Sequence, residues 1–178
     1  MGLHSGDTSE LFFDDLIVTT ADILGGEGQG FVNMMKELPR ERLILGVGCV
    51  GAAQGAFDLT VAYITERQAF GQAVSGFQNS RYKLAEMKTD IELCRAMAEK
   101  YTAQFIAGEL TSAEASMLKL AASEMQGRVA DQCVQLFGGY GYMTEYPISR
   151  AYLDARIQRI YGGTSEIMKE LISRSIVS

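Results

Sequence analysis

The chain has 178 residues, a formal net charge of −6 and a sequence pI of about 4.9. Hydrophobic residues make up 47% and charged residues 21%, which indicates a folded globular protein and excludes a disordered, collagen-like or mucin-like chain. The acidic balance argues against nucleic acid as a partner, because phosphate binding requires a basic surface.

Three cysteines and a single histidine, His4, restrict the chemistry further. The cysteines lack metal-ligand spacing and their odd number argues against a disulfide framework, so we expect a reducing compartment and no metal site. One histidine also argues against a histidine-based triad. No apolar run approaches the length of a membrane-spanning helix and no signal-peptide pattern is present, so we expect no membrane span.

Residues 1–30 differ in pattern from the rest of the chain. The apolar runs LFF at 11–13 and LIV at 16–18 flank two aspartates, which predicts one or two short strands and a turn. So few strands cannot bury their faces alone. We therefore expect this segment to be the remnant of a β-domain whose other strands are absent, with Met1 as an artificial start within a larger protein.

From residue 31 onward the apolar residues recur at helical spacing. Pro39 suits the first turn of a helix, and Thr164 suits an N-cap. The predicted helices cover residues 39–67, 79–107, 112–137, 147–160 and 164 onward. Four glycines between residues 46 and 55 interrupt the first of these helices, and we expect them to allow close approach by another helix or a ligand.

Three helices of nearly thirty residues, each about 40 Å long, are joined by short loops in this prediction. Short loops make neighbouring helices antiparallel. The expected fold is all-α: an up-and-down four-helix bundle with an additional C-terminal helix and a short β remnant at the N-terminus. We place the domain boundary between residues 1–30 and residues 31–178.

Three motifs each permit an ordinary structural interpretation and a functional one. ELPRER at 37–42 is compatible with a helix start in which Glu41 interacts with the helix dipole. QLFGGYGY at 135–142 is compatible with a helix end, or with a backbone that approaches a phosphate or a ring. IYGGTSE at 160–166 is a Gly-Gly turn into a capped helix, which is an anion site in principle.

These motifs occur together with RQAFG at 67–71, and the combination resembles the C-terminal part of the acyl-CoA dehydrogenases over nearly the whole chain. Residues 10–15, ELFFDD, resemble the last strands of that family's middle β-domain. The resemblance implies a helical bundle that holds FAD against the middle domain and across a subunit interface.

The resemblance also implies the reaction and its partners. It implies oxidation of acyl-CoA to trans-2-enoyl-CoA in fatty acid β-oxidation, with electron-transfer flavoprotein as acceptor. A carboxylate removes the α proton, and the β hydrogen leaves as hydride to the flavin. A homo-oligomer, dimer or tetramer, is implied, in the bacterial cytoplasm or the mitochondrial matrix. As a fragment, the chain is expected to be inactive alone.

The catalytic base is implied by a departure from the commonest family pattern. Many members place a glutamate directly after the tyrosine of the third motif, where this chain has Gly162. The long-chain and isovaleryl types place it near the start of the first bundle helix, which matches Glu41, with Glu37 as a weaker candidate. Arg42 then holds the carboxylate or lines the thioester pocket, and Gly162 and Gly163 lie at the substrate.

The resemblance further implies nine FAD contacts, among which Glu166 is often glutamine in the family. Arg67 matches an arginine that approaches the pyrophosphate from a neighbouring subunit. The implied FAD contacts are Arg67, Phe70, Gln78, Gln135, Leu136, Gly138, Gly139, Thr164 and Glu166. Two other functions remain open: an acyl-CoA oxidase with dioxygen as acceptor, and a non-catalytic helical module that only oligomerises.

Overall fold

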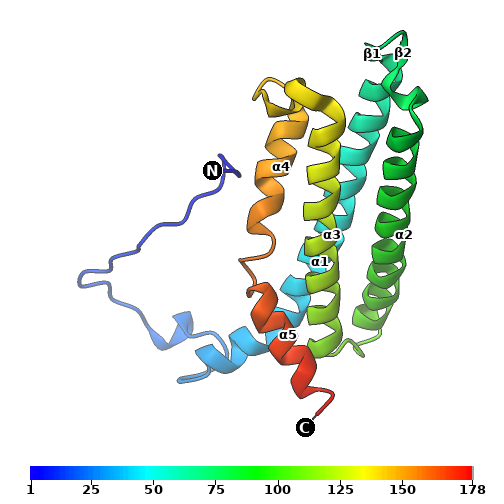
Figure 1. Cartoon of the computed structure of the whole chain (residues 1–178). Coiled ribbons are helices and arrows are strands. Elements are labelled where there is room, and N and C mark those ends of the chain that lie inside the picture. The colour runs from blue at the N-terminus through cyan, green and yellow to red at the C-terminus, as the bar shows by residue number, and fades with distance from the viewer. Residues whose placement is uncertain (178) are drawn as a thin grey trace.

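The computed structural model describes residues 1–177 as five α-helices with one small hairpin (Figure 1). The helices are α1 (Gly30–Glu66), α2 (Gln78–Ile106), α3 (Ser112–Phe137), α4 (Pro147–Ile157) and α5 (Ser165–Arg174). Strands β1 (Gln68–Ala69) and β2 (Gln72–Ala73) form the hairpin, and 3-10 turns cover Thr20–Asp22, Val74–Gly76 and Gly138–Tyr142. The predicted all-α bundle is confirmed.

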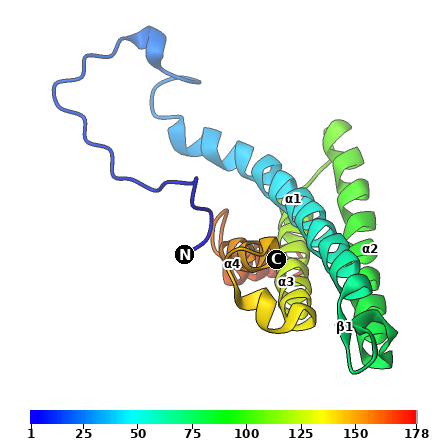
Figure 2. The same cartoon turned by 90° about the horizontal axis from the view of Figure 1, so that it is seen from above.

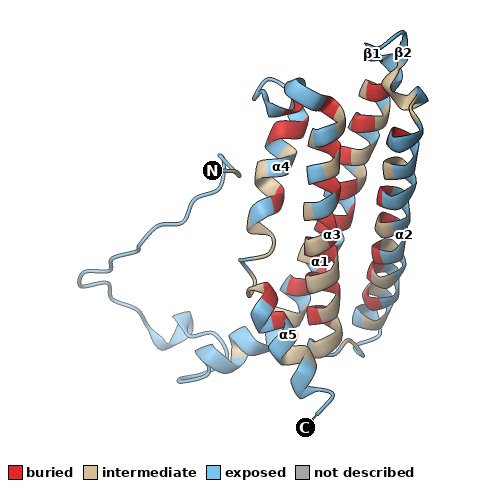
Figure 3. Cartoon of the chain, in the orientation of Figure 1, coloured by how far each residue is buried: buried red, intermediate tan, exposed pale blue. Residues whose placement is uncertain are grey.

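Helix α3 is the centre of the bundle, since it packs against α1, α2, α4 and α5. The buried residues line the faces that these helices turn toward one another (Figure 3). In α2 and α3 they follow the predicted spacing of three and four, with Met87, Ile91 and Cys94 on α2 and Leu118, Ala122 and Met125 on α3. Burial of these apolar side chains is the main stabilising contribution.

Helix α1 begins at Gly30, well before the predicted start at Pro39. Proline is favoured in the first turn of a helix, but it can also lie in the helix interior. There it removes one backbone hydrogen bond, at a cost of about 3 kcal/mol. The buried stripe of α1 also differs from the prediction, because Val47 is exposed and small residues such as Gly46 and Ala53 are buried instead. These small residues let α1 and α3 approach closely.

Residues 1–29 form no strand. The N-terminus lies beside α4, where Leu3 N–H donates to Asp154 Oδ1, and the segment then follows an exposed path outside the bundle until it enters α1 (Figures 1 and 2). A strand needs a hydrogen-bonding partner, and within residues 1–177 no strand lies beside the apolar runs at 11–18. The strands that do form lie at 68–73, where we predicted a loop. Phe70 and Gly71, both with positive φ, make the tight turn between them.

Apart from the start of α1, the predicted helix boundaries are close to those observed. Thr111 caps α3 in a capping box with Glu114, and the Thr164 hydroxyl accepts from Ile167 N–H at the start of α5. Helix α4 ends at Ile157, three residues before the predicted end. By length and composition alone α1 could cross a bilayer, a criterion that core helices of soluble proteins also meet. One third of its apolar stretch, 33%, is buried in the bundle.

Candidate functional site

The Gly162–Gly163 turn between α4 and α5 is held against α1 by a buried arginine. Arg42, which is 6% exposed, donates from Nε to the carbonyl oxygen of Gly162 over 3.2 Å. Desolvation lowers the pKa of Arg42, and the charge of Glu41 partly opposes that shift. The two parts of the predicted substrate site, at residues 41–42 and 162–163, therefore meet in the fold.

A buried lysine holds the same turn from the other side. Lys119 of α3 has no exposed surface, and its Nζ donates to the carbonyl oxygen of Gly163 over 2.7 Å. Burial lowers the pKa of this ammonium group. Both glycines have positive φ, +66° at Gly162 and +106° at Gly163, so a residue with a side chain would be strained at either position.

Glu41 is exposed on α1, one helical turn before Leu45. Residues four apart share a helix face, and Leu45 Cδ1 would lie 3.2 Å from a Cβ placed on Gly162. Glu41 therefore stands on the side of α1 that borders the glycine turn. The alternative carboxylate, Glu37, lies a turn earlier and forms an exposed ion pair with Arg40 at 2.8 Å.

The start of α5 completes this end of the molecule. The buried Ser165 donates from Oγ to Glu124 Oε1 over 2.8 Å and closes the turn with a backbone bond to the carbonyl of Arg159. The pKa of Glu166 is lowered by hydrogen bonds from its own backbone N–H and from the Thr164 hydroxyl. We call Glu41, Arg42, the 162–163 turn, Thr164 and Glu166 the base cluster.

A second group of predicted residues lines one groove at the other end of the bundle. The groove has a volume of about 570 Å³. Arg67, Gln135, Leu136, Gly138 and Gly139, all predicted to contact FAD, line it, together with Val74, Phe137, Tyr140 and Met143. We call this the arginine groove.

The arginine groove combines a fixed cation with open backbone. The Arg67 guanidinium carbon lies 5.2 Å from the centre of the Tyr140 ring, in cation–π geometry. Gly138 has a φ of +63°, and no atom lies within 4 Å of a Cβ placed on Gly138 or Gly139. A ligand can therefore approach this backbone closely, and an arginine, an amide side chain and an aromatic ring suit an anionic nucleotide.

Phe70 and Gln78 border this end without lining the groove. Phe70 is 97% exposed at the hairpin tip and packs edge-on to Phe77 at 6.4 Å between ring centres. Gln78, the first residue of α2, donates from its side-chain amide to the Tyr82 hydroxyl.

The base cluster and the arginine groove are too far apart to share one ligand within a chain. Arg42 lies about a third of the way along α1, and Arg67 lies directly after its end, 25 residues later. At 1.5 Å per residue the two positions are about 38 Å apart along the helix, which is longer than an extended flavin dinucleotide. Figure 1 shows the hairpin and α5 at opposite ends of the bundle.

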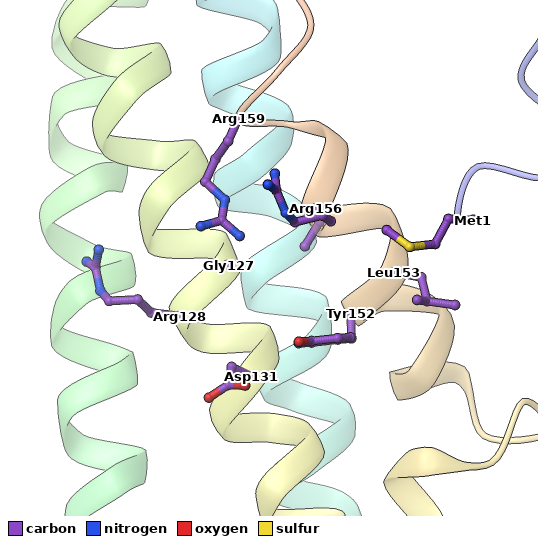
Figure 4. Close-up of a pocket in the computed structure, with 9 residues that line it drawn as sticks. Met1, Gly127, Arg128, Asp131, Tyr152, Leu153, Arg156 and Arg159 are labelled. Carbon is purple, nitrogen blue, oxygen red and sulfur yellow. The ribbon is translucent and has the colours of Figure 1, made fainter. Parts of the chain in front are cut away.

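A further hollow, of about 470 Å³, lies between α3 and α4 and contains none of the predicted site residues. Figure 4 shows Arg156, Arg159, Tyr152 and Asp131 around it, with the Arg128 side chain directed toward α2. Arg128 pairs there with Asp90 at 2.9 Å, and Arg159 lies 3.6 Å from Glu124. Within residues 1–177 no cluster of histidine, cysteine or acidic residues could hold a metal ion.

Comparison with known proteins identifies the family. The profile of the acyl-CoA dehydrogenase C-terminal domain matches residues 28–177. The chain belongs to this family. It is 50% identical over 178 residues to the mitochondrial long-chain specific acyl-CoA dehydrogenase of Rattus norvegicus, covering 100% of this chain and 41% of that protein.

Solved acyl-CoA dehydrogenases share the fold. The crystal structure of acyl-CoA dehydrogenase from Geobacillus kaustophilus superposes with a TM-score of 0.94 at 44% identity, covering 98% of this chain and 46% of that chain. A Mycobacterium smegmatis glutaryl-CoA dehydrogenase solved in complex with FADH2 gives a TM-score of 0.76 at 27% identity, covering 78% of this chain and 36% of that one. The chain thus spans less than half the length of these relatives.

Two residues at the sites of this acyl-CoA dehydrogenase domain, Tyr140 and Lys119, were not predicted from the sequence. Tyr140 lies inside the quoted glycine motif, but nothing in the sequence indicated that its ring would lie beneath Arg67. Lys119 lies in the apolar stretch SMLKLAAS, next to the seam residue Leu118. A lysine among apolar residues is the available signal, although it does not reveal the partner, which lies in the turn between α4 and α5.

Proposed function

We propose that this chain is the C-terminal part of an FAD-dependent acyl-CoA dehydrogenase that oxidises acyl-CoA to trans-2-enoyl-CoA. The observation that carries the proposal is the base cluster, in which Glu41 borders a glycine turn fastened by Arg42. In this reaction the Glu41 carboxylate takes the α proton. The β hydrogen leaves with its electron pair, and the Cα–Cβ double bond forms.

The residues of the arginine groove fit the dinucleotide part of FAD. Arg67 offers a guanidinium to the pyrophosphate, Gln135 an amide, and the bare backbone at 138–139 leaves room for the adenosine half. When bound, FAD supplies the acceptor for the hydride. Phe70 and Gln78 extend this surface, while Thr164 and Glu166, as members of the base cluster, are proposed to contact the flavin end of FAD.

The separation of about 38 Å between the two groups supports a flavin shared between subunits. One chain's arginine groove then holds the dinucleotide whose reactive ring lies at another chain's base cluster. The enzyme is therefore proposed to be a homo-oligomer, with electron-transfer flavoprotein as acceptor and β-oxidation as its setting. We place it in the bacterial cytoplasm or the mitochondrial matrix, and we propose residues 1–30 as the end of the middle β-domain.

Glu41→Gln in the flavin-loaded enzyme that contains this chain tests the assignment. Loss of a positioned general base costs about 100- to 10,000-fold in rate. The variant should still bind acyl-CoA but reduce the flavin slower by about that factor, as followed by flavin absorbance in stopped flow. Glu37→Gln, one turn earlier on the same exposed helix, is the matched control and should reduce the flavin at the wild-type rate.

Flavin reduction at the wild-type rate in Glu41→Gln would contradict the proposal. Moving the glutamate to Gly162, where other family members carry it, is a poor rescue in this chain. The φ of +66° at Gly162 and the nearby Leu45 side chain strain any larger residue there. Oxygen consumption with acyl-CoA would favour the oxidase, and a bundle that neither binds flavin nor turns over would favour the oligomerisation module.

A further inference from the structure

Lys119 is a buried charge without a buried counter-charge. Within residues 1–177 no carboxylate comes within ion-pairing distance of Nζ, and its hydrogen-bond acceptor is the carbonyl of Gly163. The surrounding titratable groups are Arg42 and Cys49 of α1, Glu124 of α3 and Glu166 of α5. Burying an ammonium group costs several kcal/mol, so packing alone does not explain a lysine at this position.

Two buried cations bond to consecutive carbonyls of one turn. Arg42 binds the oxygen of Gly162 and Lys119 that of Gly163. In a planar trans peptide the N–H of the following residue points opposite to the C=O. The two bonds therefore direct the N–H groups of Gly163 and Thr164 away from the cations. Among the hydrogen bonds of residues 1–177, neither N–H has a protein acceptor.

We propose that Lys119 is a positioning residue for the reaction of Glu41. Together with Arg42 it fixes the Gly162–Gly163 turn, so that the outward N–H groups and the bare glycine backbone keep one geometry beside the base. The role of Lys119 in the reaction rests on the proposed function. Its role in holding the Gly162–Gly163 turn does not. A glycine pair with positive φ has many accessible conformations, and the two cations select one of them.

The first experiment examines the turn in this chain without flavin. Lys119→Met keeps an unbranched apolar stem of similar length and removes the ammonium group. The 13C carbonyl resonance of Gly163 should shift on loss of its hydrogen bond, while that of Gly139 in the arginine groove stays unchanged. An unaltered Gly163 resonance in folded Lys119→Met would overturn the proposal.

The second experiment examines the reaction in the flavin-loaded enzyme. We expect Lys119→Met to lower kcat about tenfold or more, with KM changed much less, because the turn loses one of its two holding bonds. Its urea midpoint should equal or exceed that of the wild type, since an apolar side chain replaces a buried charge. Lys119→Arg, which retains a donor, should recover part of kcat.

The outcomes separate the two proposals. If the wild type does not reduce its flavin with acyl-CoA, the proposed function fails, and the Gly163 resonance alone decides whether Lys119 holds the turn. If the wild type is active and Lys119→Met matches its kcat, the positioning role is wrong. The positioning role is also wrong if Lys119→Met loses stability together with kcat and Lys119→Arg does not recover kcat. That pattern indicates a purely structural lysine.

Discussion

At Gly163 the positive φ is the main constraint against a side chain, and a contact with the flexible end of Met168 adds to it. The backbone has a φ of +106°, and a Cβ placed there would lie 2.6 Å from Cε of Met168. We therefore predict that Gly163→Ala lowers the free energy of unfolding by about 1–3 kcal/mol. Gly139→Ala is the control: its φ is not positive and its Cβ meets nothing within 4 Å, so its stability should change by less than about 0.5 kcal/mol. Equal urea midpoints for the two variants would contradict the argument.

The residues of the base cluster differ in how far the sequence could reveal them. Glu41, Arg42 and the glycine turn were predicted as one site because they match family motifs, and the fold brings Arg42 to the turn. Lys119 was not predicted, because helical spacing assigns burial only to its neighbour Leu118. Its burial depends on the 162–163 turn, whose position is set by the packing of α5 on α3.

At the scale of elements, α1 combines two kinds of glycine that sequence cannot distinguish. A Cβ placed on Gly46 would lie 2.6 Å from Leu118 Cγ, whereas a Cβ on Gly55 meets nothing within 4 Å. Gly46 thus permits the close contact of α1 with α3, while Gly55 is exposed and only lowers helix propensity. The four glycines were expected to allow a close approach, and Gly46 does so within the chain.

We therefore predict opposite effects of the same substitution on one helix. Gly46→Ala should lower the free energy of unfolding by about 1–3 kcal/mol through overpacking against Leu118. Gly55→Ala should raise it by up to about 1 kcal/mol, because alanine restricts the unfolded chain and favours the helix. Urea unfolding followed by circular dichroism measures both. A stabilised Gly46→Ala would mean that α1 and α3 can separate at no cost.

The elements that sequence predicted best are those whose partners are large apolar side chains. The seams of α2 and α3 followed their spacing because Met87, Ile91, Leu118 and Met125 mark the buried face. The α1 seam was misplaced because its buried face contains glycine and alanine, which carry little hydropathy signal. The strand predicted within 11–18 depended on pairing partners that local sequence cannot supply.

At the scale of the whole molecule, buried thiols make the free energy of unfolding depend on pH in the alkaline range. Burial raises the pKa of Cys49 to about 12 and that of Cys133 to about 11, from 9.0. Above pH 9 the unfolded chain releases these protons while the folded chain retains them, so the free energy of unfolding falls as pH rises. The limiting slope is about 1.4 kcal/mol per pH unit for each thiol.

Urea titrations between pH 8 and pH 11 should therefore show a smaller slope for Cys49→Ala than for the parent chain. Buried Lys119 acts in the opposite direction, because its lowered pKa leaves the unfolded chain with the extra proton below about pH 10.5. Lys119 is present in both proteins, and Cys49 and Lys119 influence each other's pKa, so the difference between the slopes reports the thiol together with its effect on Lys119. Identical slopes would mean that Cys49 ionises freely in the folded chain.

Self-association is the last expectation for the whole molecule, and it follows from apolar surface that the bundle leaves uncovered. Phe12, Phe13 and Ile17 in the N-terminal segment and Phe31 at the start of α1 are each at least 66% exposed. We predict that the chain forms dimers or larger species at micromolar concentrations in multi-angle light scattering. Sulfate should strengthen the association, because it favours apolar burial, whereas contacts between charges would weaken with salt.

A matched pair of variants tests which surface drives this association. Replacing Phe12 and Phe13 together by serine removes two exposed rings and should shift the population toward monomer. Replacing His4 and Ser9 together by alanine alters exposed polar residues of the same segment and should leave the population unchanged. A monomeric parent chain would contradict the prediction. Equal association of both variants would assign it instead to an apolar surface of the helical bundle.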